Sequence, residues 1–240
     1  MRSLIFVLAC CTLATCSSPS SAQDKTEKKS AAVGDGFTAI FNGSDLTGWK
    51  GNADLWSVED GSITGRTTAE APLKFNTFLI YEVGPVADFE LRLDYKIKAG
   101  NSGIQYRSQI IEADKFIVGG YQADIDATSK YTGINYEERG RGILAERGQR
   151  VTIAADGAKS AEDFADREEL SKEFDPAGWN HYRVVAKGNR LSHYINDVLM
   201  SEVIDNQESE AEKSGVLAFQ VHQGPPMVVR FKNIRIKTLD

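Results

Sequence analysis

The ten residues from Phe89 to Lys98 constrain the fold of this chain most strongly. Apolar and charged side chains alternate through the whole segment. Because successive side chains of a strand point to opposite faces, one face of this strand is expected in a core and the other in water. A shift of one residue would bury five charged side chains, so the register of the strand is well specified.

Short runs of the same kind follow one another along the rest of the chain, separated by turn signals. Asp60-Gly61 joins two runs and Gly188-Asn189 joins two more, as is typical of β-hairpins. Residues 183–203 contain three such runs with short turns between them. This stretch therefore predicts a three-stranded meander.

The remaining segments complete the expected fold class. Apolar positions change parity between Phe231 and Ile234, which predicts a bulge near Lys232-Asn233. The one helix is expected over residues 160–172, with Ser160 as its cap. Many short strands, regular turns and one short helix predict an all-β fold, an antiparallel two-sheet sandwich or jelly roll.

The first 22 residues have the features of an export signal. Arg2 supplies a positive charge, and an apolar run follows it. Leu13-Ala14-Thr15-Cys16 resembles a bacterial lipobox, whose cysteine carries a lipid, whereas Ser20-Ser21-Ala22 is an alternative cleavage site. We expect an exported protein, periplasmic or held in the cell envelope, whose contact with a membrane is made only through a lipid anchor at Cys16.

The composition bounds what the rest of the chain does. Residues 23–35 are rich in Ser, Lys, Glu and Ala and are expected to form a flexible linker, with one domain over residues 36–240. All three cysteines lie in the first 16 residues, so the domain has neither a disulfide nor a thiolate nucleophile. The net charge of -6 argues against a nucleic-acid partner.

Polar side chains are expected to share one face of several strands. They come from three stretches and comprise Gln105 and Arg107, then Gln122, Asp124 and Asp126, then Gln220 and His222. Glu137, Arg139 and Arg141, which follow Tyr136, are further candidates, and an exposed loop cluster of salt bridges is the alternative for them. Acids, amides and guanidinium groups on one sheet surface suit a sugar site. The alternative is the solvated face of an antiparallel sheet, which alternates in the same way.

Several segments together resemble a known family, the 3-keto-disaccharide hydrolase domain, formerly DUF1080. They are Asn42-Gly43 with Leu46-Thr47-Gly48-Trp49, Asn101-Ser102-Gly103-Ile104, Gly120 to Asp126, Trp179-Asn180, Gly215 to Gln223 and Val229 to Ile234. The resemblance runs from about Gly36 to the C-terminus. It implies a concanavalin-like jelly roll and activity on 3-keto-glycosides, as a lyase, a hydratase or a net hydrolase.

That chemistry needs a base near C2, an acid near the glycosidic oxygen and a donor to the C3 oxyanion. Asp124 and Asp126 stand two residues apart on one face, so each carboxylate raises the pKa of the other. His222 is a further acid–base candidate, and Glu137 and Glu138 could carry the acid–base work instead. The remaining polar residues are expected to bind the sugar.

Two questions stay open at this point. Asp124, Asp126, Gln122 and His222 could hold a divalent cation, but no compact ligand motif is present. A non-catalytic carbohydrate-binding module on the same fold is the alternative function, because fold alone does not fix activity.

Overall fold

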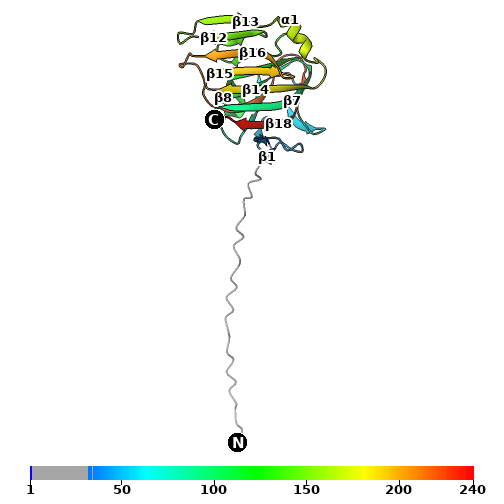
Figure 1. Ribbon diagram of the computed structural model, residues 1–240. Helices are drawn as coiled ribbons and strands as arrows, with labels where there is room; N and C mark the ends of the chain where they lie inside the picture. Colours follow the sequence, from blue (N-terminus) through cyan, green and yellow to red (C-terminus); the bar gives the residue numbers. More distant parts are fainter. Residues whose placement is uncertain (2–31, 34) are drawn as a thin grey trace.

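The computed structural model describes residues 1, 32–33 and 35–240 and consists of two packed β-sheets (Figure 1). The expected export signal, the lipobox at Cys16 and most of the linker lie outside the described residues. The all-β two-sheet sandwich expected from the alternating pattern is confirmed. No helix within the described part of the chain has the length and apolar character needed to cross a membrane.

The larger sheet has eleven strands. In spatial order they are β1 (Ala32–Val33), β2 (Phe37–Ala39), β18 (Val228–Thr238), β7 (Phe89–Ala99), β14 (Asn180–Lys187), β15 (Arg190–Ile195), β16 (Val198–Asp205), β12 (Gln149–Ile153) and β13 (Lys159–Asp163), with β5 (Ser62–Arg66) and β4 (Trp56–Glu59) paired beside β18. The expected meander is present as β14, β15 and β16, and the Asp60-Gly61 hairpin as β4 and β5.

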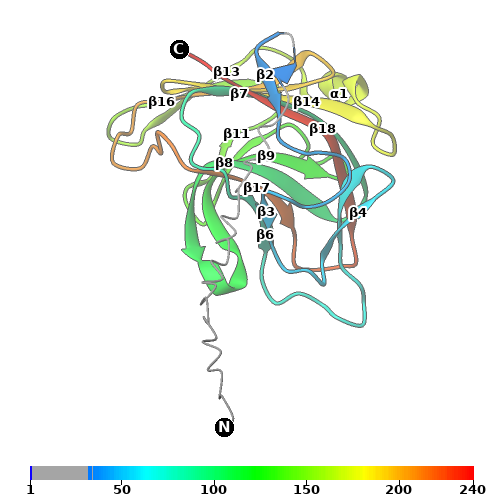
Figure 2. The same ribbon diagram turned by 90° about the horizontal axis from the view of Figure 1, so that it is seen from below.

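The smaller sheet has seven strands. In spatial order they are β11 (Gly142–Ala145), β10 (Asn135–Glu138), β9 (Ile117–Asp126), β8 (Asn101–Glu112), β17 (Val216–Val221), β6 (Thr77–Tyr81) and β3 (Trp49–Lys50). Figure 2 shows this sheet below the larger one, with the β8–β9 hairpin on one side and the β17–β18 connection on the other.

The core lies between the two sheets. Phe89, Leu91, Leu93 and Tyr95 of β7 are buried and their charged neighbours are partly exposed, as the alternation predicts. Phe219 of the smaller sheet stacks on Phe231 of the larger one, with ring centroids 4.0 Å apart. Such aromatic pairs remove large apolar areas from water and hold the layers together.

The bulge expected near Lys232-Asn233 is confirmed. The register between β18 and β7 shifts between Lys232 and Arg235, and Asn233 has a positive φ of 53°. Because of the extra residue, Phe231 and Ile234 both reach the core although they stand an odd number of positions apart.

The prediction of a helix over residues 160–172 is wrong in the extent of the helix and in its cap, Ser160. Residues 159–163 form β13, an exposed edge strand paired with β12. The helix α1 covers only Arg167–Leu170 and is followed by a 3₁₀ turn, η2 (Ser171–Glu173); a second turn, η1 (Ala113–Lys115), ends β8. Asp166 caps α1 by accepting from the amides of Glu168 and Glu169. The Asp156-Gly157 pair before β13 is a hairpin signal that outweighs the helical pattern.

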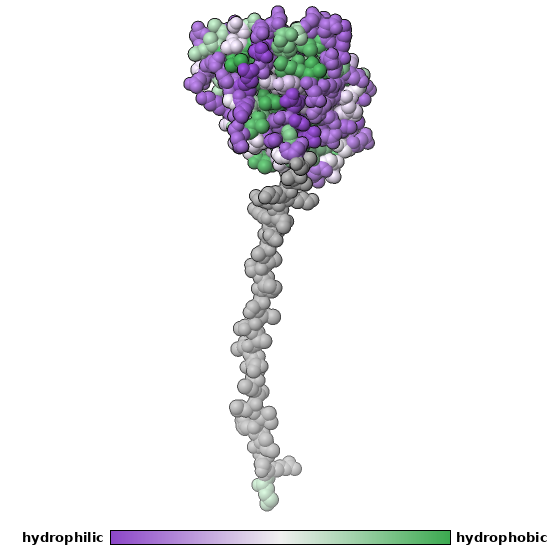
Figure 3. Space-filling view, viewed as in Figure 1, coloured by the Kyte–Doolittle hydropathy of each residue, from purple (hydrophilic) through white to green (hydrophobic). Residues whose placement is uncertain are grey.

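The outer face of the larger sheet carries no broad apolar surface. In Figure 3 this face is mostly hydrophilic, and its hydrophobic side chains form small separate groups. The polar residues expected to form a site belong to the other layer.

Candidate active site

The outer face of the smaller sheet forms the floor of a cavity. Every residue of β9 is buried, including the polar ones that point away from the core. This face is therefore not the ordinary solvated side of a sheet. The cavity has a volume of about 870 Å³, and its polar lining includes Asn76, Asn101, Gln122, Asp124, Asp126, Glu138, Gln220 and His222.

A set of glutamine side chains organises the floor of the cavity. The Gln122 carbonyl accepts a hydrogen bond from Gln105 at 2.7 Å and another from Gln220 at 3.2 Å. The Gln122 amide donates to Asp124 Oδ1. Because one side chain of Gln122 contacts three neighbours, its amide orientation and the position of Asp124 are fixed together.

Gly103 makes this arrangement possible. It lies opposite Asp124 on the neighbouring strand, and a Cβ atom there would overlap the Gln122 side chain. The absence of a side chain lets Gln122 lie across β8 and reach Asp124. The Asn101-Ser102-Gly103-Ile104 segment thus has a packing reason for its glycine.

Asp124 is the most perturbed acid of the cavity. Burial raises the pKa of its carboxyl well above the usual range, and the charges of Glu138 and Asp126 raise it further. The hydrogen bond from Gln122 acts in the opposite direction on this pKa. Among the described residues, Asp124 Oδ2 has no hydrogen-bond partner. A protonated Asp124 therefore has a proton to donate into the cavity.

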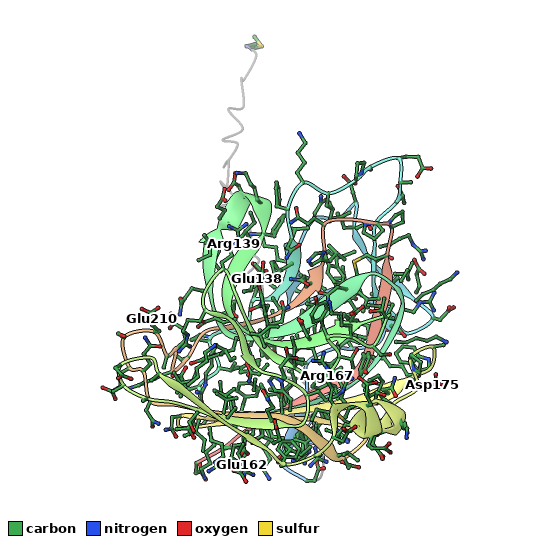
Figure 4. The ribbon with its side chains drawn as sticks, turned by 90° about the horizontal axis from the view of Figure 1, so that it is seen from above. Glu138, Arg139, Glu162, Arg167, Asp175 and Glu210 are labelled. Atoms are coloured by element: carbon green, nitrogen blue, oxygen red, sulfur yellow. The ribbon has the colours of Figure 1, made fainter. Side chains whose placement is uncertain are left out.

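Glu138 is the second buried acid of the cavity, and it has a different environment. Its Oε1 accepts from Asn76 at 3.0 Å, and its Oε2 faces the Gln220 amide at 3.4 Å. Two amide donors of this kind fix the positions of both carboxyl oxygens of Glu138. Figure 4 shows Glu138 beside Arg139 on the hairpin side of the smaller sheet, on the opposite side of the molecule from Glu162.

The sequence argument selected Glu137 where the cavity contains Glu138. Tyr136 pairs with Gln122 across β10 and β9, so Tyr136 and Glu138 share the cavity face. Glu137 pairs with Tyr121, whose ring is in the core, and therefore points to the other face. The alternation of side chains along β10 could have identified Glu138, because the neighbours Tyr136 and Glu137 cannot both face the cavity.

Asp126 lines the cavity, but its oxygens also hold the following loop. Oδ1 accepts from the Thr128 amide at 2.9 Å, and Oδ2 accepts from the Thr128 hydroxyl at 2.8 Å. The Tyr131 amide donates to Oδ2 at 3.3 Å. These contacts identify Asp126 as a loop-bracing residue at the edge of the site.

Three further expected residues lie at the cavity wall. His222 has Nδ1 hydrogen-bonded to the Gln223 carbonyl, which leaves Nε2 as the available nitrogen. Tyr136 is half-buried, and burial raises the pKa of its hydroxyl, with the charges of Glu138 and Asp124 adding to the effect. Arg139 is exposed, and its guanidinium has no hydrogen-bond partner among the described residues.

Arg141 does not reach the cavity and pairs with Glu137 instead. Arg141 Nε lies 2.6 Å from Glu137 Oε2, and Arg141 Nη2 lies 2.7 Å from Asp205 Oδ2. The Tyr121 hydroxyl donates to the same Asp205 oxygen at 2.6 Å. This network joins the smaller sheet to the end of β16, so the expected roles of Glu137 and Arg141 at the sugar lack support from their positions.

Arg107 was expected beside Gln105, and that placement is wrong. A bulge in β8 gives Arg107 a positive φ of 47° and breaks the alternation. Its guanidinium donates to the carbonyls of Ala87 and Gly188 and to Asp88, each at 2.7 Å. Arg107 lines a separate cavity of about 750 Å³. Gln105 is on the expected face but lies fully buried beside Gln122 and does not line the cavity.

No ready-made cation cage is present among the residues that the structure describes. No group of three or more His, Cys, Asp or Glu side chains is arranged to hold a metal there. One Asp124 oxygen and both Asp126 oxygens already accept hydrogen bonds from the protein. The proposed cation ligands therefore fit hydrogen bonding better than metal coordination.

The fold and the cavity together define a class: a concanavalin-like sandwich with an acid–amide cavity on the outer face of its smaller sheet. Residues 36–237 match the 3-keto-alpha-glucoside-1,2-lyase-like domain. The chain belongs to this family, whose members are 3-keto-glycoside lyase and hydrolase domains, and membership indicates an enzyme.

A curated relative agrees with this assignment. A 3-keto-disaccharide hydrolase from Bacteroides thetaiotaomicron is 31% identical over a match that covers 45% of this chain and 49% of the relative. The chain therefore spans about half the length of this curated relative.

Two solved structures share the fold at low sequence identity. A putative glycosyl hydrolase from Parabacteroides distasonis has a TM-score of 0.56 at 24% identity, covering 86% of this chain and 95% of that one. The carbohydrate-binding module CBM66 from Bacillus subtilis has a TM-score of 0.53 at 18% identity, covering 81% and 98%.

Proposed function

We propose that the protein cleaves glycosides that are already oxidised to a ketone at C3, by elimination followed by hydration. The observation that carries the proposal is the pair of buried acids, Asp124 and Glu138, in one cavity with different hydrogen bonding. Among the described residues Asp124 has one oxygen without a partner, whereas amides donate to both oxygens of Glu138. Two carboxyl groups in different surroundings can divide the acid and base roles.

In the first step, a base removes the proton at C2, which the neighbouring C3 ketone acidifies. We assign this base to Glu138, because two amide donors hold its carboxyl group in place at the cavity. The electrons left at C2 form an enolate whose negative charge lies on the C3 oxygen. Arg139 at the rim, with an unpaired guanidinium, is the candidate donor to that oxygen.

In the second step, the bond between C1 and the glycosidic oxygen breaks as the C1–C2 double bond forms. The leaving oxygen needs a proton, and protonated Asp124 can supply it through Oδ2. Water then adds across the double bond, with oxygen bonding to C1 and hydrogen to C2. The sum of elimination and hydration is hydrolysis, and it requires no covalent nucleophile.

His222 is the alternative base in this scheme. Its Nε2 is available at the cavity wall, whereas Glu138 lies deeper and already accepts hydrogen bonds. The two assignments differ in what they predict for substitution at each position, so one experiment separates them.

The test is turnover of a 3-keto-disaccharide in D₂O, with the sugars followed by NMR. Elimination and hydration place deuterium at C2 of the released 3-keto sugar, whereas direct displacement retains the original proton. The product incubated without enzyme corrects for spontaneous exchange. Product without enzymatic deuterium at C2, or no product from the folded protein, would overturn the proposal.

Variants assign the roles. Glu138→Gln should lower the rates of C2 exchange and of cleavage about 100-fold or more. Asp124→Asn should lose cleavage and retain C2 exchange. Asp114→Asn changes an exposed acid of the same layer outside the cavity and should leave turnover unchanged. If His222→Ala abolishes exchange and Glu138→Gln does not, His222 is the base.

The same experiment tests the alternative function, a non-catalytic carbohydrate-binding module. Such a module would bind glycans saturably without releasing sugar. Binding would then survive Asp124→Asn, and no variant would change the products, because none would form.

We further propose that the enzyme works outside the cytoplasm, held to the cell envelope through Cys16. The support is the N-terminal sequence alone, which lies outside the described residues. Mass spectrometry of the protein from a bacterial host would detect the lipid on Cys16. An unmodified N-terminus after residue 22 would remove the anchor and retain export.

A further inference from the structure

An apolar strip borders the acids on the outer edge of the cavity. Tyr136 of β10 pairs with Gln122 on one side and with Ile143 of β11 on the other. The three side chains therefore form one row that runs from the polar floor to the edge strand of the smaller sheet.

Ile143 is exposed for a hydrophobic residue of this size. It is 37% exposed, while its neighbour Leu144 is buried in the core. Among the described residues, it is the one large exposed hydrophobic side chain that lines the cavity. The exposed part of Ile143 is apolar area available for a ligand, while the rest of the side chain is held by the protein.

The charges of the cavity add a second constraint. Its lining contains three carboxyl groups, Asp124, Asp126 and Glu138, against the single guanidinium of Arg139. A negatively charged group bound near Asp126 and Glu138 would be repelled, because part of the site excludes water and screens charge weakly. The strip therefore suits a neutral apolar group and opposes an anionic one.

We propose that Tyr136 and Ile143 form a subsite for the leaving group, and that the preferred leaving group is a neutral, apolar alcohol. The inference rests on the proposed function, because it needs the sugar ring over Asp124 and Glu138. From there the leaving group extends along the row toward β11. The apolar faces of Tyr136 and Ile143 cover it, and its hydroxyl oxygen is the one that Asp124 protonates.

The test compares two 3-keto-glucosides whose leaving alcohols have similar acidity, methanol and cyclohexylmethanol. Similar acidity removes differences in leaving-group chemistry, so a difference in KM reports contact with the protein. The cyclohexylmethyl compound should have a KM lower by about tenfold, since one or two apolar contacts are worth that much. An analogue with a carboxylate on the cyclohexyl ring should lose this advantage.

Ile143→Ser should remove most of the difference by raising the KM of the cyclohexylmethyl compound, with kcat little changed. Ile110→Ser is the matched control, because Ile110 is 48% exposed on the same sheet and does not line the cavity. Equal KM values for the two substrates in the unsubstituted enzyme, or an equal effect of both serine variants, would overturn the subsite.

Binding of the corresponding unoxidised glucosides, measured by calorimetry, separates this inference from the proposed function. Tighter binding of the cyclohexylmethyl glucoside that Ile143→Ser abolishes, without turnover of either ketone, would support the subsite and remove the enzymatic proposal. Turnover of both ketones without any binding preference would support the enzymatic proposal and remove the subsite.

Discussion

Asp124 and Glu138 are connected through two amide side chains. Gln220 faces Glu138 with its Nε2 at 3.4 Å and donates to the Gln122 carbonyl at 3.2 Å, and Gln122 donates to Asp124. The two acids therefore share one hydrogen-bond chain. A substitution in the middle of this hydrogen-bond chain should change the pKa of the acid that it contacts.

Gln122→Leu is expected to move the pH dependence of catalysis. The Gln122 hydrogen bond lowers the pKa of Asp124 against the effect of burial, so its loss should raise this pKa further. If protonated Asp124 is the acid, activity persists to higher pH, and the basic limb of the kcat/KM profile moves upward. A basic limb that stays in place, or moves down, would show that Asp124 is not the acid.

Asp124→Asn is expected to stabilise the protein at neutral pH by about 1–2 kcal/mol. The pKa of Asp124 is raised in the folded state, so ionisation above the unfolded value of about 3.8 opposes folding. The asparagine variant removes this cost. Urea unfolding at pH 7 and at pH 3.5 should show the gain at the higher pH and little at the lower one. An equal effect at both pH values would contradict the assigned cause.

Gly103→Ala is expected to lower both activity and stability. The new methyl group overlaps Gln122, and relief of such overlap typically costs about 1–3 kcal/mol. A double variant with Gln122→Ala removes the overlapping atoms. It should recover stability, and its turnover should be that of Gln122→Ala alone, because Asp124 has lost the same donor in both variants. If the double variant is no more stable than Gly103→Ala alone, the overlap is not the cause.

His193 is expected to make the fold less stable in acid. It is fully buried between the sheets, and burial lowers its pKa to about 3, against about 6.5 when unfolded. Nε2 lies 2.8 Å from the Tyr106 hydroxyl, which can donate to it only while the imidazole is neutral. The contribution of neutral His193 to the free energy of unfolding is therefore fully present above pH 6.5, and it is lost as the pH decreases toward 3. Between pH 7 and pH 5 the loss should be about 2 kcal/mol.

Replacing His193 isolates its contribution to the loss of stability in acid. His193→Gln keeps a polar side chain that does not titrate, so it should unfold with less pH dependence over the same range, although it is less stable at pH 7. Chemical denaturation of both proteins at pH 7, 6 and 5 measures the difference. Parallel curves would show that another group causes the loss in acid.

The regular parts of the fold could be predicted because their side-chain periodicity is unbroken. The alternation of β7 required one buried face, and the parity change at Lys232-Asn233 required an extra residue. Gln122, Asp124, Gln220 and His222 were found for the same reason. Their strands keep the two-residue period up to the cavity.

Where local backbone geometry breaks the period, the sequence argument failed. Arg107 lies at a bulge with a positive φ, and nothing in the neighbouring residue types marks that position. Asn76 lies outside any strand, so no period places it at the cavity. Its contact with Glu138 depends on how distant segments pack together.

That dependence has a consequence for how such a site can arise and be lost. Glu138 meets Asn76 across 62 positions of the chain and Gln220 across 82. No contiguous fragment shorter than the span from Asn76 to Gln220 contains all three side chains. The hairpin of β9 and β10, copied or transplanted alone, would bring both acids and Gln122 without the two amides that hold Glu138, so the site is inherited only with the complete sandwich.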